Sequence, residues 1–485
     1  APGLDAARGN LKDARRAARA RRRGASPGPA TDGAPPAEPF PTGEILDLLR
    51  RTPRRLSAGI VVRDDAVHLP ACLASLSTCA AEILVVDARA AAAAGAAPLA
   101  AGGATLLRPR RLDDQAEARN ALLRRARGDW VLLLDAAERL TAEGAAALPA
   151  ALGDHRVLYH ALEIRRGAPF GARLEVRLIR NAPGIRFHGR AEARATASLA
   201  ALERRIGLGG GEPPIVVLGA GDSCAAAPAD AARREALLRR DLAEDPTDGD
   251  ALRARAWFDL RDGRPERALE PLRQARRTLL GAGRRPVPLD LEEATTLEAL
   301  CLLRLERARE AADLIVWYHG RCRETSNTLY IAGAAAKAQG DAPRAADLLR
   351  RALDLRGRPG YLEALPEVAG AALPALYGST LLERGDRAGA RAAFSEALGR
   401  DARDLPAALG LIALQLSEGQ GLQAAEGLDR LAAERGDDPR TWIAAGVLLD
   451  GFPALGEVSA AWMQEGRRRF PGHAEIARRA GRGAA

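Results

Sequence analysis

One apolar run in the first third of the chain constrains the fold more than any other feature. Residues 130–134 read Trp-Val-Leu-Leu-Leu without a polar interruption, and Asp135 ends the run. An unbroken apolar strand is typical of a parallel sheet that is covered on both faces. Because open α/β sheets bind ligands at the carboxyl ends of their strands, we expect Asp135 to lie at a binding edge.

The chain around this run alternates between strand and helix patterns. Apolar runs predict six strands, at residues 56–62, 82–87, 130–135, 157–164, 174–179 and 215–218. Apolar residues at helical spacing predict a helix at 68–76. A second helix is expected from an N-cap at Asp113 to Arg127, and Gly128 supplies its C-terminal stop. This order of elements predicts a parallel sheet with flanking helices.

After residue 229 the strand patterns end and paired amphipathic helices follow. Glycine-centred turn signals recur at Gly263, Gly340, Gly385 and Gly419, and Ala-rich helices are expected after the last three of them, at 342–355, 388–398 and 422–433. A period near roughly 34 residues, with small residues where helices approach, is typical of a helical solenoid. Residues 229–478 resemble tetratricopeptide repeats, and the resemblance implies a surface that binds a protein or peptide partner.

Three parts are therefore expected: a disordered basic arm at 1–42, an α/β domain at 43–222 and helical repeats at 229–478. The net charge is +9, and residues 1–55 alone hold 12 Lys and Arg against 6 Asp and Glu. Since the remainder is close to neutral, a nucleic-acid-binding protein is not expected. Binding of a polyanion through the basic arm stays open as a weaker alternative.

The sequence also argues against a membrane protein and a disulfide scaffold. No apolar run approaches the roughly 18 to 20 residues that span a bilayer, and the first residues lack the apolar core of a signal peptide. We therefore expect a cytoplasmic protein. The five cysteines form no CxxC pair, so a structural zinc site or a disulfide framework is not expected.

Six blocks of the α/β part occur in an order that is known from one enzyme family. They lie at residues 60–65, 82–87, 118–120, 128–130, 134–140 and 177–190. With the repeats that follow, they resemble a family-2 glycosyltransferase of the GT-A fold that carries C-terminal tetratricopeptide repeats. The resemblance implies a GT-A-like α/β domain that transfers a sugar from a nucleotide-sugar donor to a protein or cell-surface precursor.

The resemblance also implies roles for residues near the strand ends. Asp135, with Glu138, would hold Mg²⁺ or Mn²⁺, because these hard cations prefer oxygen ligands. The metal would neutralise the donor's diphosphate as it leaves. Either Glu192 or His188 would accept the proton of the attacking group. The residues implied in binding the donor nucleotide are Asp64, Asp87, Arg119 and Asn120.

The family's motifs are incomplete in this chain. The Asp-x-Asp motif reads Asp135-Ala136-Ala137, so that its second carboxylate is missing. Alanines replace polar residues after the second strand, and the family's His-Glu pair reads Glu192-Ala193. The alternative interpretation is therefore a catalytically degenerate transferase that acts as a protein–protein scaffold through its repeats. A homodimer through exposed solenoid faces also stays open.

Overall fold

A computed structural model describes Gly43 and residues 54–63, 65–89, 103–111, 113–167, 171–219, 228–281 and 288–482. By their contacts these residues form two units. The first comprises Ala1–Cys301 with Pro359–Glu363, and the second comprises Leu302–Arg358 with Ala364–Ala485. The predicted basic arm at 1–42 lies outside the described residues. The predicted bounds 43–222 and 229–478 stay a prediction.

The first unit contains a mixed sheet of nine strands within the described residues. Its order is β3-β2-β1-β4-β7-β6-β9-β5, and β8 pairs with β6. The strands are β1 (Leu56–Val62), β2 (Glu82–Asp87), β3 (Thr105–Leu107), β4 (Trp130–Asp135), β5 (Glu138–Leu140), β6 (Val157–Arg165), β7 (Ala172–Arg180), β8 (Gly209–Gly211) and β9 (Val216–Gly219). All six predicted strands are confirmed.

The prediction of a parallel sheet is wrong for β7 and β5, although β6 pairs in parallel with β8 and β9. Strands β1 to β4 pair in parallel, as predicted, but β7 runs antiparallel to both β4 and β6. The physical reason is the short connection between β6 and β7, which leaves no room for the crossover that parallel neighbours need.

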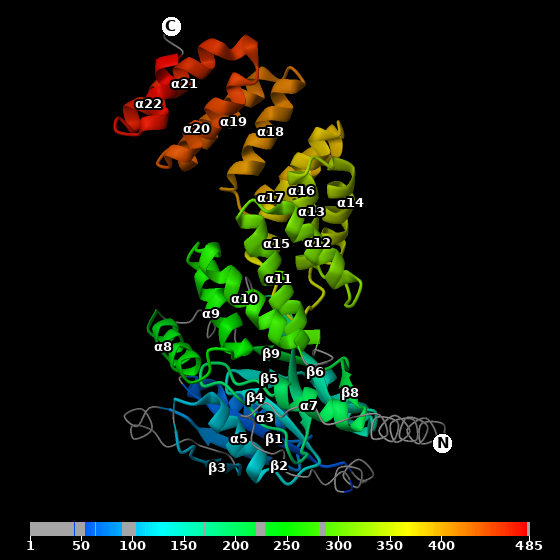
Figure 1. Cartoon of the computed structure of the whole chain (residues 1–485). Coiled ribbons are helices and arrows are strands. Elements are labelled where there is room, and N and C mark those ends of the chain that lie inside the picture. Colours follow the sequence, from blue (N-terminus) through cyan, green and yellow to red (C-terminus); the bar gives the residue numbers. More distant parts are fainter. Residues whose placement is uncertain are drawn as a thin grey trace, which may run out of the picture. The chain divides into compact units, whose positions relative to one another are not determined.

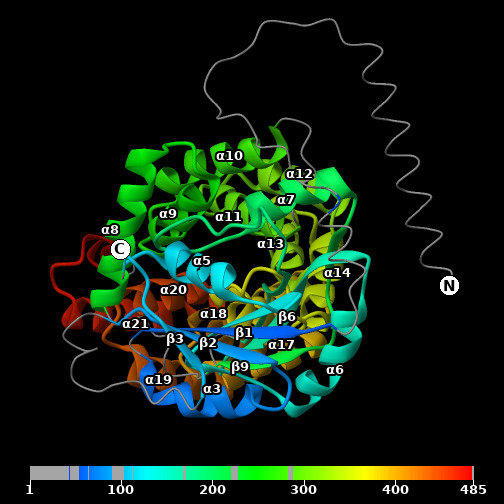
Figure 2. The same cartoon turned by 90° about the horizontal axis from the view of Figure 1, so that it is seen from below.

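Helices cover both faces of the parallel part, as the apolar strand patterns predict. Successive strand residues point to opposite faces, so Val61 and Leu133 lie in one core cluster while Ile60 and Leu134 lie in the other. The first cluster includes residues of α5 (Gln115–Arg125) and α7 (Thr196–Ile206), and the second includes residues of α3 (Leu69–Leu76) and α6 (Ala142–Gly153). Figure 2 shows these helix pairs on opposite sides of the sheet.

The predicted start and end of α5 need correction. Its N-cap is Asp114 and not Asp113, because the extended backbone of Asp114 lets its side chain accept from Glu117 N at 2.9 Å. Asp113 instead pairs with Arg233 at 2.7 Å. The helix ends at Arg125, two residues before the predicted end, because Ala126 adopts an extended conformation.

Four further helices follow the sheet along the chain: α8 (Pro228–Glu244), α9 (Gly249–Arg261), α10 (Pro265–Leu280) and α11 (Pro288–Arg304). All of them except the last residues of α11 belong to the first unit. No helix in the described ranges has the length and apolar character to cross a bilayer.

The second unit is entirely helical in its described part, and Figure 1 shows its helices as successive antiparallel pairs. They are α12 (Ala308–His319), α13 (Ser326–Ala338), α14 (Ala342–Asp354), α15 (Pro366–Ala369), α16 (Ala372–Glu383), α17 (Arg387–Arg400), α18 (Leu405–Ser417), α19 (Gly421–Arg435), α20 (Pro439–Asp450), α21 (Gly456–Arg469) and α22 (Ala474–Arg482). The predicted solenoid is confirmed for this C-terminal part of the chain. Gly340, Gly385 and Gly419 end helices with φ of 80°, 81° and 73°, a conformation that favours glycine.

Small residues allow neighbouring helices of the second unit to pack closely. Phe394 on α17 is buried, and its ring faces Gly378 on α16 and Gly410 on α18. A Cβ at Gly378 would lie 2.8 Å from Phe394 Cδ1, and a Cβ at Gly410 would overlap the ring. The two glycines therefore make room for one aromatic side chain that connects three helices.

We expect Gly410→Ala to lower the free energy of unfolding by about 1–3 kcal/mol, because the added methyl group overpacks the Phe394 site. The matched control is Gly399→Ala on α17, where an added Cβ meets nothing within 4 Å. This control should stabilise by about 0.5–1 kcal/mol through helix propensity. Urea unfolding followed by far-ultraviolet circular dichroism measures both changes. Equal stability of the two variants would contradict the packing argument.

Candidate functional site

The carboxyl ends of β1, β2 and β4 meet at one edge of the sheet. Val62 is aligned with Asp87 at the end of β2, and Val61 is aligned with Asp135 at the end of β4. The strand order reverses between β1 and β4, which is the position where open α/β sheets bind ligands. Asp135 therefore lies at the edge where the sequence places it, and Asp87 lies at the same edge, while their assigned roles stay predictions. Asp64 lies outside the described residues.

Asp87 is enclosed by an arginine two residues further along the chain. Arg89 donates through Nε and Nη2 to the two carboxylate oxygens of Asp87, at 2.9 and 3.0 Å. Both side chains are buried. The hydrogen bond from Arg89 holds the pKa of Asp87 below its ordinary value, although burial opposes this. Asp87 is thus an ionised but internally paired carboxylate.

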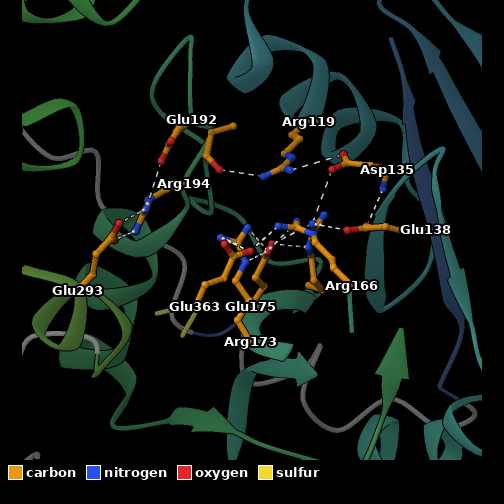
Figure 3. A network of polar contacts seen from close by, with 12 residues as sticks. Arg119, Asp135, Glu138, Arg166, Arg173, Glu175, Glu192, Arg194, Glu293 and Glu363 are labelled. Atoms are coloured by element: carbon orange, nitrogen blue, oxygen red, sulfur yellow. Dashed lines mark hydrogen bonds and ion pairs between the residues drawn. The ribbon is translucent and has the colours of Figure 1, made fainter. Parts of the chain in front are cut away.

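Asp135 and Glu138 lie together at the turn between β4 and β5 (Figure 3). Glu138 Oε2 accepts a hydrogen bond from Asp135 N at 2.9 Å. The turn is held further by Asp65, whose Oδ2 accepts from Ala137 N at 3.0 Å. The structure therefore brings together the two residues that the sequence analysis assigned to a metal.

A buried arginine from β7 faces both of these carboxylates. Arg177 Nη2 lies 2.9 Å from Glu138 Oε1 and 3.7 Å from Asp135 Oδ2, and the Arg177 side chain is 3% exposed. Arg177 Nε also donates to Glu175 Oε2 at 2.8 Å. Arg119 Nη2 lies 3.8 Å from the other oxygen of Asp135. The guanidinium of Arg177 thus lies close to three carboxylates. The guanidinium of Arg119 approaches Asp135, which is the most exposed of the three.

The network continues along one face of β7 (Figure 3). Glu175 pairs with Arg173 and, at 3.4 Å, with Arg166. Both of these arginines also pair with Glu363, at 2.7 Å from Arg166 and 3.5 Å from Arg173. The described edge therefore carries a continuous set of ion pairs from Asp135 to Glu363.

The pKa values of the three carboxyls around Arg177 diverge. Burial raises the pKa of Glu138 to about 7, because Arg177 only partly offsets burial and the neighbouring Asp135 charge adds to it. Burial also acts on Asp135 and Glu175, but in each the surrounding arginines outweigh it and hold the pKa below its ordinary value. Of the three carboxyls, Glu138 is thus the one whose pKa is raised.

The residues predicted to bind the donor have structural partners. Arg119 donates to the backbone oxygen of Ala193 at 2.8 Å. Asn120 donates to Phe187 O and accepts from Phe187 N, both at 2.9 Å. These contacts attach α5 to the segment that contains the predicted proton acceptors.

The two predicted proton acceptors differ in their surroundings. His188 is exposed, and its backbone exchanges two hydrogen bonds of 2.9 Å with Arg194. Glu192 forms ion pairs with Arg194 and Arg234, and Arg194 continues to Glu293 (Figure 3). Within the described part of the chain, neither residue forms a hydrogen bond or an ion pair with Asp135 or Glu138. Their catalytic assignment stays a prediction.

The two carboxylates that were assigned to a divalent cation already face a buried cation of the protein. In the part of the chain that the structure describes, no three His, Cys, Asp or Glu side chains are grouped so that they could hold a metal ion. Asp135 and Glu138 already face Arg177, and a metal would have to displace that buried cation. The assignment of Mg²⁺ or Mn²⁺ to these residues stays a prediction, and no chemical step is derived from it.

The sequence analysis missed three arginines and two carboxylates of the network, namely Arg166, Arg173, Arg177, Glu175 and Glu363. The alternation Arg173-Leu174-Glu175-Val176-Arg177 was a usable signal, because charges at every second position of a strand share one face. Glu363 carried no such signal, because it lies 186 positions after Arg177 in a segment without periodicity.

The second unit contains a cavity between three consecutive helices. Its walls combine apolar side chains with a few polar ones, and Val316 on α12 is 57% exposed beside it. The lining residues are Ala312, Ile315, Val316, His319, Ala332, Ala336, Gln339, Asp341, Arg344 and Leu348. The cavity is small, and its apolar wall carries polar groups at the margin.

Comparison with known proteins identifies the helical part. Residues 381–446 match the family model for the tetratricopeptide repeat. The C-terminal region carries tetratricopeptide repeats. A TPR repeat-containing protein of Synechococcus elongatus is 36% identical over 154 residues, which are 31% of this chain and 38% of the relative. The chain thus matches well under half the length of that relative.

Two solved structures are also similar in part. PilF of Pseudomonas aeruginosa is 19% identical, covers 48% of this chain and 97% of its own, and has a TM-score of 0.35. A tetratricopeptide repeat protein of Parabacteroides merdae is 13% identical, covers 53% and 93% respectively, and has a TM-score of 0.39.

Glu138 should make stability depend on pH around neutrality. Its pKa in the folded protein, about 7, lies above the ordinary 4.5, so the folded state retains a proton that the unfolded state loses. The contribution is fully present below about pH 4.5 and is lost as the pH rises through 7. Glu138→Gln removes this dependence, so the variant should gain stability relative to the wild type between about pH 5 and pH 8.

Urea unfolding across that pH range measures the effect. The control is Glu143→Gln, which alters an exposed carboxyl on α6 and should keep the wild-type trend. A constant stability difference between Glu138→Gln and the wild type at all pH values would contradict the raised pKa.

Proposed function

We propose that this protein binds a protein or peptide partner through its tetratricopeptide repeats, and that its α/β unit does not transfer sugar. The observation that carries the proposal is the match of residues 381–446 to the repeat family within a fully helical second unit. Stacked helical repeats present extended surfaces that recognise other proteins.

The surface of the second unit supports this proposal. Exposed apolar side chains occur on several of its helices, at Val316, Leu422, Val447 and Val458. Val316 also lines the cavity between α12, α13 and α14. Apolar side chains at such positions stabilise a complex when a partner removes them from water.

The resemblance to glycosyltransferases implies sugar transfer as a more specific activity. The geometry of the site supports sugar transfer less well than the repeats support partner binding. Asp135 and Glu138 lie at the expected edge but face Arg177, and Asp87 is enclosed by Arg89. A bound cation needs open coordination positions for the donor's phosphates. A buried guanidinium occupies this place without offering such positions. The cytoplasmic location and the homodimer remain predictions.

The wild type should therefore show no metal-dependent binding of nucleoside diphosphates or nucleotide-sugars up to about 1 mM, an affinity worth only about 4 kcal/mol. Isothermal titration of uridine and guanosine diphosphates and their sugars, with and without Mn²⁺, provides the measurement. Binding that requires Mn²⁺ and disappears in Asp135→Ala would instead establish a working donor site.

Partner binding is tested by selecting peptides from a displayed library on the full-length protein and measuring their affinities by fluorescence anisotropy. Val316→Asp places a charge beside the cavity of the second unit, so selected peptides should bind at least about tenfold more weakly, equivalent to about 1.4 kcal/mol.

The matched control is Val67→Asp, which changes a valine that is 79% exposed in the first unit. This variant should bind the selected peptides as the wild type does. The proposal fails if the library yields no binding peptide, or if both variants bind the selected peptides as tightly as the wild type.

A further inference from the structure

A short segment between α14 and α15 belongs to the first unit although the residues on both sides of it belong to the second. This segment is Pro359–Glu363, called here the clasp. It contacts β7, the α11 residue Glu292 and the arginines of the ion-pair network.

The backbone of the clasp extends the sheet. On the side of β7 away from β6, β4 pairs only with Leu178 to Arg180. Further along β7, Leu174 N donates to Gly360 O at 2.7 Å, and Gly360 forms a parallel bridge with Arg173. Addition of an extended segment to a strand edge is a general mode of peptide recognition.

A buried carboxylate fixes the next two residues of the clasp. Glu292 is 1% exposed, and its Oε1 accepts from Tyr361 N at 3.1 Å and from Leu362 N at 3.2 Å. A Cβ at position 360 would lie 2.6 Å from this same oxygen. A side chain at position 360 would therefore push this carboxylate from the place where it accepts both hydrogen bonds.

Side chains of the clasp add two specific contacts. Tyr361 donates its hydroxyl to Glu212, and Glu363 pairs with Arg166 and Arg173. The edge thus selects for a glycine, then an aromatic hydroxyl, then an acidic residue two positions later. Such a combination of backbone pairing and side-chain pockets is what gives extended peptides their specificity.

We infer that the β7 edge is a peptide-binding site that the chain fills with its own clasp, and that it accepts in trans an extended acidic peptide of the pattern Gly-Tyr-Leu-Glu. The site lies in the first unit and does not depend on what the tetratricopeptide repeats bind. Because the clasp is covalently attached, its effective concentration is on the order of millimolar, and a free peptide competes poorly until the clasp is weakened.

The test uses a fluorescent synthetic peptide of residues 357–366 and full-length variants, with binding measured by anisotropy. Gly360→Ala forces Glu292 away from the clasp and should bind the peptide at least about tenfold more tightly than the wild type does. Gly153→Ala, where an added Cβ meets nothing within 4 Å, is the control and should match the wild type. A peptide with glutamine in place of Glu363 should bind more weakly to every variant.

Hydrogen exchange distinguishes folding from opening of the clasp. Protected amides in β6 show that Gly360→Ala is folded, and faster exchange at Leu174 N, which donates to Gly360 O, shows that its clasp has opened. If that variant does not fold, the double variant Tyr361→Phe with Glu363→Gln removes side-chain contacts without changing the backbone. Absence of peptide binding to a folded, opened variant overturns the inference. Equal binding to the wild type also overturns it, as does a wild-type dimer that the peptide dissociates, because then a second copy supplies the clasp.

Discussion

The ion pairs of Arg177 are the interaction on which the candidate edge depends. Three carboxylates, those of Asp135, Glu138 and Glu175, approach a single guanidinium that is 3% exposed. Without a cation these carboxylates would repel one another in a medium that screens poorly. Without carboxylates the buried arginine would carry a desolvation penalty of several kcal/mol. The carboxylates and the buried arginine therefore stabilise each other.

This arrangement changes what the edge can do chemically. A divalent ion shares its coordination positions between protein and substrate, so its charge acts directly on a departing phosphate. The charge of Arg177 is enclosed and directed toward protein carboxylates. The edge is consequently suited to holding protein segments together. One of these segments is the clasp, whose Glu363 pairs with Arg166 from far along the chain.

Sequence patterns predicted the elements better than their connections. The apolar runs located all six predicted strands, and glycine-centred turns located the repeats, because both signals are local. The direction of β7 was missed, since it depends on how the chain returns after β6. Asp113 and Asp114 are adjacent acids, and only backbone geometry decides that Asp114 caps α5. The pairing of Arg166 with Glu363 spans 197 positions and leaves no periodic trace.

The position of Asp135 illustrates why a retained motif residue does not by itself indicate retained chemistry. A carboxylate at the end of β4 has two independent physical uses here. One is to bind a metal with a second carboxylate, which Ala137 no longer supplies. The other is to neutralise Arg177 and Arg119, which requires no partner motif. Replacing Asp135 would leave Arg119 and Arg177 with less compensating charge, so the stability of the edge is a sufficient reason for a carboxylate at this position.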